Sequence, residues 1–479
     1  MAVESRGYAQ VMARRGAIMQ RALGLDYAQF EREGGVAFDY EGLVSSPAYD
    51  LEAVRRIQAA FKVGDTPLWE LPRLTKLVRQ TAPRGQGARI LIKDEAGNAA
   101  GSFKARRASL AVAHAADLGY EGVVAATSGN YGAAVASQAA MRGLKAIILQ
   151  EVFDSKWRGQ PEILEKTRVC EAYGAEVWQV TVGPELFYWH LITLEETGFF
   201  NASLYTPYGI LGIETLGYEI AEQCRTRFGR DPDAILVTHS GGGNVTGTAR
   251  GLHRAGAHPE IIGVSVDLTG LHMASDHDFN RKSFTTGHTG FAFPFTVNPD
   301  RVDVPRNAAR GLRYLDRYVT ITQGEVFFAT QLLAELEGLE RGPAGNTSLA
   351  AALSIARQLP EDALVVVQET EYTGAGKHPT AQLTMARELG IDVRLGDPRE
   401  NQPGKRIVIP DDIDQVRTVD IDLNVLRRSY LGRIADRRPD RPLSEEETRF
   451  LADDTGVSLG ALATMWEEVA RRPRAKARA

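Results

Sequence analysis

The sequence predicts an α/β protein with two open, mainly parallel sheets flanked by helices, and with helical extensions at both ends. Short apolar runs alternate with helix-like segments over residues 90–367, a rhythm that predicts right-handed crossovers between parallel strands. A chain of 479 residues is also too long for one ordinary core. We expect N-terminal helices with the start of a large domain (1–96), a small α/β domain (97–204), a large α/β domain (205–400) and a C-terminal extension (401–479).

The first sixty residues carry apolar positions at helical spacing. Helices are expected over 5–23, 27–33 and 47–61, and we interpret them as a framework or subunit-contact layer. The residue before Pro67 avoids the helical region, so 63–68 should be a turn that leads into an extended segment.

Two alternating blocks follow. The first is expected to contain strands at 88–93, 122–126, 144–149 and 176–180, with helices at 106–118, 133–141 and 161–173. The second should contain strands at 234–238, 261–266 and 363–367, with helices at 247–255, 325–339 and 348–359. The weakly patterned stretch 268–305 is too long for an idle connection and is expected to line the site or an interface. Beyond Pro398 we expect one strand at 407–410 and two charged helices within 444–471.

Composition narrows the class of protein. With 43% hydrophobic and 24% charged residues and a net charge of -5, the chain has a globular composition and no general affinity for nucleic acid is expected. No apolar run approaches the roughly 20 residues that span a bilayer, so a cytoplasmic protein without membrane contact is expected. Cys170 and Cys224 are expected to be reduced packing residues, and no histidine pair has the spacing of a metal motif, so no metal site is expected.

Lys104 lies between a strand-like run and a helix-like run. A helix N-terminus favours anions, so a lysine there needs compensation. One compensation is covalent, because a partly neutral amine can form a Schiff base with pyridoxal phosphate. The alternative is a surface lysine on a first helical turn. Nearby, Ser102 is expected to assist a phosphate or the lysine, and Arg106 and Arg107 to face solvent, a carboxylate or a subunit boundary.

A second loop, residues 240–248, contains three consecutive glycines between a strand and a helix. Its amides can converge on an anion at the helix N-terminus, which predicts a phosphate site. The loop lacks both the Lys-Ser/Thr ending of a nucleotide P-loop and the Gly-x-Gly-x-x-Gly pattern of a dinucleotide site. A packing turn is the alternative.

Two further loops also follow strands. Residues 127–132 offer hydroxyls, an amide and a helix N-terminus, which suit a carboxylate, with Asn130 available for a phenolic oxygen; the alternative is an ordinary helix cap. Residues 371–378 are rich in glycine and supply a hydroxyl, or form only a tight turn. The four loops should gather at one edge of two sheets, where an amine, a carboxylate site, a phosphate site and a hydroxyl match pyridoxal phosphate bound to an amino acid.

The ordered set Ser102-Phe103-Lys104, Thr127-Ser128-Gly129-Asn130, Gly241-Gly242-Gly243-Asn244 and Thr373-Gly374-x-Gly376 resembles the fold type II pyridoxal phosphate enzymes. This resemblance implies that the cofactor lies in a cleft between domains. It also implies a Schiff-base role for Lys104 and a contact of Asn130 with the ring oxygen. By the same resemblance the phosphate is held by Gly241, Gly242, Gly243 and Asn244, and the substrate carboxylate by Thr127, Ser128 and Gly129.

The sequence indicates the partner of the pyridine nitrogen less directly. Cysteine synthases place a serine in a Gly-x-Ser-Ser-Gly turn, where this chain has Gly342-Pro343-Ala344-Gly345-Asn346 with alanine at the serine position. The Thr-Gly-x-Gly-Lys arrangement is instead similar to threonine synthases, which assigns the ring nitrogen to Thr373. A neutral hydroxyl leaves that nitrogen largely unprotonated and limits the ring as an electron sink.

Within this superfamily the chain most resembles the family of 2-amino-4-oxopentanoate thiolase β subunits, through motifs such as Ile92-Lys93-Asp94-Glu95 and residues 283–290. The resemblance implies cleavage of that amino acid by coenzyme A to acetyl-CoA and alanine, in ornithine degradation. It also implies a small α subunit, and a homodimer core is expected. Tyr205 and His288 are candidates to contact the substrate ketone. The alternative is another reaction on the same cofactor, such as the β-replacement or elimination of cysteine or threonine synthase-like enzymes.

Overall fold

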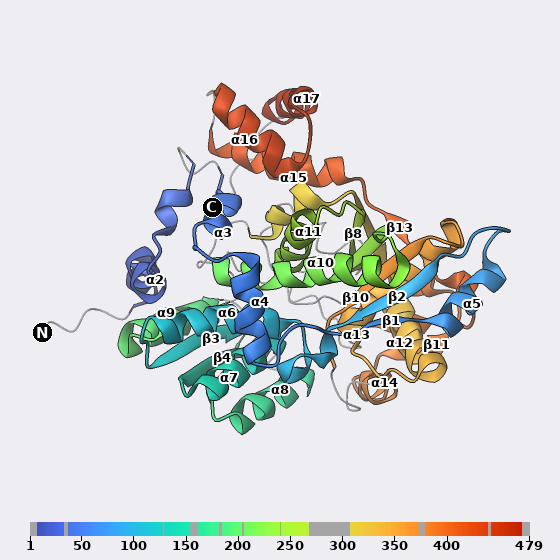
Figure 1. Ribbon diagram of the computed structural model, residues 1–479, viewed down its shortest axis with the longest axis horizontal. Coiled ribbons are helices and arrows are strands. Elements are labelled where there is room, and N and C mark those ends of the chain that lie inside the picture. Colours follow the sequence, from blue (N-terminus) through green and yellow to red (C-terminus); the bar gives the residue numbers. More distant parts are fainter. Residues whose placement is uncertain are drawn as a thin grey trace, which may run out of the picture.

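The computed structural model describes residues 7–32, 37–127, 129–153, 161–181, 184–203, 206–239, 241–267, 307–372, 379–438 and 442–471. Figure 1 shows two main sheets, the smaller at lower left with β3 and β4 and the larger toward the right with β2 and β10. Helices flank both sheets, which confirms the predicted α/β class. The division of the chain at residues 96, 204 and 400 stays a prediction.

The smaller sheet has four parallel strands in the order β5-β4-β3-β6. These are β3 (Gly122–Thr127), β4 (Lys145–Phe153), β5 (Glu176–Thr181) and β6 (Phe200–Asn201). The intervening helices are α7 (Asn130–Arg142), α8 (Pro161–Ala172) and α9 (Pro184–Thr197), and α6 (Lys104–Asp117) precedes them. Helix α9 and the short strand β6 were not predicted from the sequence; the other elements lie close to the predicted ranges.

The larger sheet has seven strands in the order β1-β2-β10-β7-β8-β9-β13. They are β1 (Leu68–Glu70), β2 (Arg89–Asp94), β7 (Ala234–Thr238), β8 (Glu260–Val266), β9 (Arg317–Ile321), β10 (Leu364–Glu369) and β13 (Val419–Asp420). The five central strands are parallel and the two edge strands are antiparallel. Strand β10 therefore lies between β2 and β7, although it comes late in the chain.

Alternation along the central strands divides the core of the larger sheet into two faces. Leu91, Ile235 and Val366 pack with α10 (Pro207–Phe228) and α11 (Gly243–Arg254) on one face. Ile90, Leu236 and Val367 pack on the other face with the helices α5 (Pro72–Thr81), α12 (Gln323–Glu337) and α13 (Pro343–Ile355). Helices α10 and α11 cross closely, because a Cβ on Gly217 would lie 1.9 Å from the Thr248 carbonyl oxygen.

Short helices precede the sheets: α1 (Tyr8–Ala13), α2 (Arg15–Leu23), η1 (Tyr27–Phe30), α3 (Tyr40–Ser45) and α4 (Leu51–Ala60). The single helix predicted for 5–23 is wrong, since the helical conformation is interrupted at Arg14. After the larger sheet come α14 (Pro379–Glu388) and the parallel pair β11 (Asp392–Leu395) and β12 (Arg406–Ile409), which confirms the strand expected at 407–410.

Beyond β12 and β13, the C-terminal extension continues with α15 (Leu423–Arg437), α16 (Glu445–Thr455) and α17 (Leu459–Ala470), at the top of Figure 1. Its buried side chains, among them Leu431, Leu451 and Leu462, join the core around α10 and α11. Helix α16 begins with a capping box between Ser444 and Glu447. Within the described part of the chain, no helix has the length and apolar character needed to cross a membrane.

Candidate active site

Lys104 is the first residue of α6, at the carboxyl-end side of the larger sheet. The segment before it reverses direction through left-handed residues, with φ of 62° at Ala100 and 67° at Gly101. Two backbone hydrogen bonds hold this turn to the chain beyond β10. The Phe103 amide donates to the Thr370 carbonyl (2.9 Å), and the Tyr372 amide donates to the Gly101 carbonyl (2.8 Å). The Lys104 ammonium lies 4.3 Å from the Phe103 ring centroid. Lys104 is therefore held beside the end of β10.

The glycine-rich turn after β7 forms the N-terminus of α11. Gly242 is left-handed (φ 74°) and the helix begins at Gly243, so its first amides point out of the turn. Asn244 is buried, and its Nδ2 donates to Gln368 Oε1 on β10 (2.5 Å). Its Oδ1 is buried and has no hydrogen-bond partner among the described residues. This turn, too, is joined to the end of β10.

The loop after β3 caps α7. Thr127 Oγ1 accepts from the amides of Gly129 (3.0 Å) and Gly132 (3.1 Å), so the helix-cap alternative is realised for this side chain. Asn130, the first residue of α7, has a buried Oδ1 for which the described residues provide no partner. Helix α7 contacts the 3-10 turn η4 (Ala99–Gly101), which leads to Lys104. The small sheet thus brings Asn130 toward the lysine segment.

Four predicted site residues, Ser128, Tyr205, His288 and Thr373, lie outside the described residues. So do most of the loop 371–378 and the stretch 268–305. Their roles stay predictions. The described site is therefore built from Lys104, Thr127, Gly129, Asn130 and the turn from Gly241 to Asn244.

The chain was compared with protein families and with known proteins. Residues 59–371 match the family model described as "Pyridoxal-phosphate dependent enzyme". The chain belongs to this family. It is also similar to two proteins named "2-amino-4-ketopentanoate thiolase beta subunit". One, from an unknown prokaryotic organism, is 65% identical over 94% of this chain and 95% of its own length. The other, from Acetoanaerobium sticklandii, is 58% identical over the same shares.

Solved structures agree with the fold. The crystal structure of a threonine deaminase from T.th. matches 68% of this chain and 98% of its own chain, with 26% identity and a TM-score of 0.53. The fold type II resemblance is confirmed, and with it the dependence of this family on pyridoxal phosphate.

The described residues fit that cofactor. A buried polar atom without a partner costs about 1–3 kcal/mol, so several on neighbouring loops indicate a missing polar ligand. Ser102 Oγ, Asn130 Oδ1 and Asn244 Oδ1 are all of this kind within the part of the chain described. They lie on the lysine segment, the α7 N-terminus and the α11 N-terminus. The Ser102 hydroxyl can donate to a phosphate oxygen, and the two amide oxygens can accept from a hydroxyl group or from a water bound with the ligand.

A second polar cluster, here called the Arg106 cluster, comprises Arg106, Glu95, Glu219 and Lys93. The fully buried Arg106 guanidinium contacts Glu95 (2.7 Å) and Glu219 (2.7 Å), and Lys93 Nζ lies 2.9 Å from Glu219. Burial lowers the pKa of Arg106, but the two carboxylates raise it by more. Of the partners predicted for Arg106, the structure selects a carboxylate rather than solvent. The cluster joins α6 to β2 and α10.

Sequence reasoning missed Glu369. This residue ends β10 and is fully buried. Burial and then the neighbouring Glu371 carboxylate raise its pKa well above the usual range, which favours the neutral acid. The only signal in the sequence is an acidic residue directly after an apolar run and a glutamine, 363–369.

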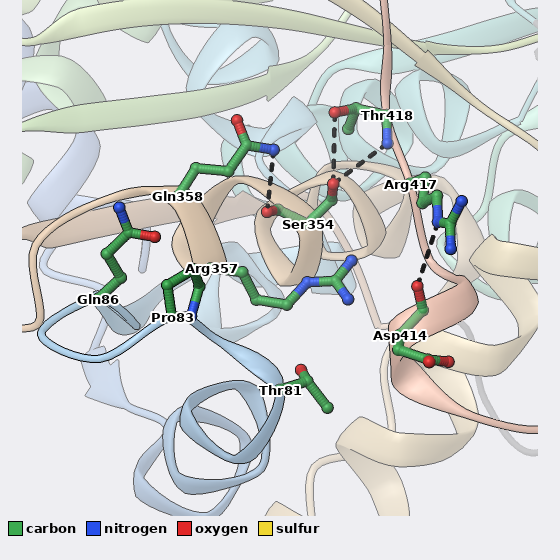
Figure 2. A pocket seen from close by; sticks show the side chains of 9 residues that line it. All are labelled: Thr81, Pro83, Gln86, Ser354, Arg357, Gln358, Asp414, Arg417 and Thr418. Atoms are coloured by element: carbon green, nitrogen blue, oxygen red, sulfur yellow. Dashed lines mark hydrogen bonds between the residues drawn. The ribbon is translucent and has the colours of Figure 1, made fainter.

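Figure 2 shows a cavity of about 460 Å³ elsewhere in the structure. Its lining includes Gln86, just before β2, and Gln358, before β10, so it lies at the amino ends of strands whose carboxyl ends adjoin Lys104. Ser354 Oγ accepts from the Thr418 amide there (3.2 Å). The cavity is therefore distinct from the site around Lys104.

The two cysteines play no part in the described site or in the Arg106 cluster. Both are buried and free, as predicted, and burial raises the pKa of each thiol to about 12. Cys170 packs in the core of the small sheet and Cys224 in the core around α10.

Proposed function

We propose that this protein is the catalytic β subunit of a thiolase that cleaves 2-amino-4-oxopentanoate (also called 2-amino-4-ketopentanoate) with coenzyme A, giving acetyl-CoA and alanine. The observation that carries this proposal is the high identity, over almost the whole chain, to two relatives named for that activity. The presence of a lysine, a glycine-rich turn and Asn130 in the arrangement described above supports it, because a non-catalytic scaffold needs none of them together.

We assign the residues as follows. Lys104 holds the cofactor covalently and, once released by the substrate amine, takes the α-proton. Gly241, Gly242, Gly243 and Asn244 hold the phosphate at the N-terminus of α11. Asn130 donates to the ring hydroxyl oxygen, and Thr127, Ser128 and Gly129 bind the substrate carboxylate. Pyridoxal phosphate, when bound, supplies a carbonyl that captures the amine and a ring that withdraws electrons from the α-carbon.

The bond changes follow from the substrate. The coenzyme A thiolate adds to the C4 ketone, the C3–C4 bond breaks, and its electron pair stays on C3. A proton then reaches C3 and Lys104 returns a proton to C2, so that alanine leaves and the acetyl group remains on sulfur. Tyr205 and His288 are proposed to steady the ketone oxygen, which develops negative charge as sulfur adds.

The relatives are named as β subunits, which implies an α subunit partner in their enzymes. We propose the same partnership for this chain. The sequence contains no recognisable nucleotide-binding motif, so part of the coenzyme A site is assigned to the small α subunit. A homodimer core and a cytoplasmic location complete the proposal.

The proposal is tested by mixing the cofactor-loaded chain with 2-amino-4-oxopentanoate and coenzyme A, with and without an α subunit, and measuring acetyl-CoA and alanine. Lys104→Ala is expected to lose roughly 10²–10⁴-fold or more in rate, because proton transfer at the α-carbon depends on this amine. It should also lose the absorbance band of the lysine-linked cofactor.

Lys145→Ala is the matched control, since Lys145 is exposed and its ammonium lies 3.6 Å from the exposed Glu121 carboxylate. It should retain both rate and absorbance. Normal turnover by Lys104→Ala would refute the role of this lysine. A spectral response to the amino acid without any acetyl-CoA, even with the α subunit, would favour the β-replacement alternative.

A further inference from the structure

Strand β10 ends between the two parts of the proposed cofactor site. Glu369 pairs in register with Asp94 of β2, while Val367 pairs with Leu236 of β7. The lysine segment continues from β2, and the glycine-rich turn continues from β7. A ligand held by Lys104 at one end and by that turn at the other must therefore pass over the carboxyl end of β10.

The residues on either side of Glu369 already hold these two loops. Gln368 accepts from Asn244 and donates to Thr248 Oγ1 (2.9 Å), both on α11. The Thr370 carbonyl accepts from the Phe103 amide (2.9 Å), one residue before Lys104. Glu369 thus ends the strand that lies between β2, which leads to Lys104, and β7, which leads to the glycine-rich turn.

The Glu369 side chain points to the face opposite Gln368, toward α13, which lies directly below β10 in Figure 1. A Cβ on Gly345 would lie only 1.8 Å from Glu369 Oε1, so the carboxyl group occupies the space that a side chain at this position would fill. Gly345 belongs to the turn where cysteine synthases carry serines. The glycine makes room for the Glu369 carboxyl next to Ala344, the position at which cysteine synthases have the serine.

The carboxyl group is poorly satisfied by the protein. Oε1 accepts one long bond from the Glu371 amide (3.4 Å), and Oε2 is buried with no partner among the described residues. Arg341, a neighbouring cation, is already paired with Asp94 (2.7 and 2.5 Å). Burial, Glu371 and Asp94 all favour the neutral form. A neutral acid here has a proton to donate and lacks an acceptor, which a pyridine nitrogen would provide.

We propose that Glu369, rather than Thr373, is the partner of the pyridine nitrogen and transfers its proton to it. This inference rests on the proposed placement of the cofactor between Lys104 and the glycine-rich turn. The proton moves from Glu369 Oε2 to the ring nitrogen and leaves a carboxylate paired with a pyridinium, with no other reagent consumed. A protonated ring withdraws more electron density than a neutral one, which suits a reaction that leaves an electron pair on carbon.

The test uses the full chain loaded with pyridoxal phosphate labelled with ¹⁵N in the ring, and reads the nitrogen shift by NMR. Wild type is expected to show a pyridinium signal. Glu369→Gln should show a neutral pyridine signal while the lysine-linked absorbance band is retained, and its rate should fall roughly 10²–10⁴-fold. Glu371→Gln, the matched control two residues away, should keep the pyridinium signal.

A neutral nitrogen in wild type would overturn the inference without any variant being needed. So would a pyridinium signal that persists in a folded Glu369→Gln protein. These outcomes are separate from the thiolase proposal: a pyridinium signal that depends on Glu369 supports the inference even if no acetyl-CoA is formed, and thiolysis with a neutral ring refutes the inference alone.

Discussion

The two buried polar clusters of this protein differ in how well their groups are paired. In the Arg106 cluster, the guanidinium lies against two carboxylates, and Lys93 adds a further ion pair. The second group, here called the β10-end cluster, comprises Glu369, Asn244, Asn130 and Ser102. Each of its members has a buried polar atom for which the described residues offer no partner.

The contrast separates a structural cluster from a ligand site. Buried charges stabilise a fold only when they are paired, and unpaired polar atoms are costly unless a ligand completes them. The Arg106 cluster is complete in the protein alone and joins α6 to β2 and α10. The β10-end cluster is incomplete without a polar ligand, and it is the one that adjoins Lys104.

The largest effect is expected from Arg106→Met. It leaves the buried Glu95 carboxylate without its cation and leaves Glu219 with Lys93 alone, so the free energy of unfolding should fall by about 3–5 kcal/mol. Arg56→Met removes an exposed pair 3.7 Å from Glu52 and should change it by only about 0–1 kcal/mol. Chemical denaturation of both variants measures the difference. Equal values for the two would contradict the structural role of the Arg106 cluster.

Local sequence patterns predicted most of the strands and loops of the two sheets. The predicted strands at 122–126, 234–238 and 261–266 lie within the observed ones, because buried parallel strands are uniformly apolar. Lys104 at a helix start and the glycine-rich turn before α11 were also found where the sequence predicted them. Polar or glycine-rich residues after a buried strand are a local signal, so they can be read directly.

The features that the sequence did not predict depend on tertiary contacts. Helix α10 is buried on most sides, so its apolar residues lack the one-sided periodicity that reveals a surface helix. Arg106 and Glu219 are 113 residues apart, and no local pattern pairs them. Glu369 acquires its position only because β10 inserts between β2 and β7, a strand order that the sequence does not state.

The two clusters should respond to pH in opposite directions. Burial raises the pKa of Glu219, but Arg106 and Lys93 lower it by more, so its stabilisation is present above the ordinary glutamate pKa and is lost as the pH falls below it. The pKa of Glu369 is raised, so the folded protein binds this proton more tightly than the unfolded chain does, and stability falls as the pH rises above the ordinary value.

Glu369→Gln is therefore expected to stabilise the cofactor-free protein at pH 7, with a gain over wild type that shrinks as the pH falls toward the ordinary glutamate pKa of about 4.3. Thermal unfolding of both proteins between these two pH values measures the gain in stability. The control is Glu371→Gln, which leaves the buried Glu369 carboxyl in place and removes only the second cause of its raised pKa, so a smaller loss of stability with rising pH should remain. A Glu369→Gln protein that is less stable than wild type at pH 7 would indicate a structural role like that of the Arg106 cluster.

The smallest effect is expected when an amide of the β10-end cluster is compared with the amide of Gln58, which borders the Arg106 cluster. Asn244→Ala removes a side chain from the proposed phosphate site, and the loss of about one hydrogen bond, roughly 1–1.4 kcal/mol, should weaken cofactor binding about 5–10-fold. Gln58 is also buried, but its amide is fully engaged with Arg106, Gly212 and Thr215 in the structural part of the fold. Gln58→Ala should lower the free energy of unfolding and leave cofactor affinity unchanged. Fluorescence titration with pyridoxal phosphate, paired with denaturation, separates the two, and weaker cofactor binding by a folded Gln58→Ala protein would show that the clusters are not independent.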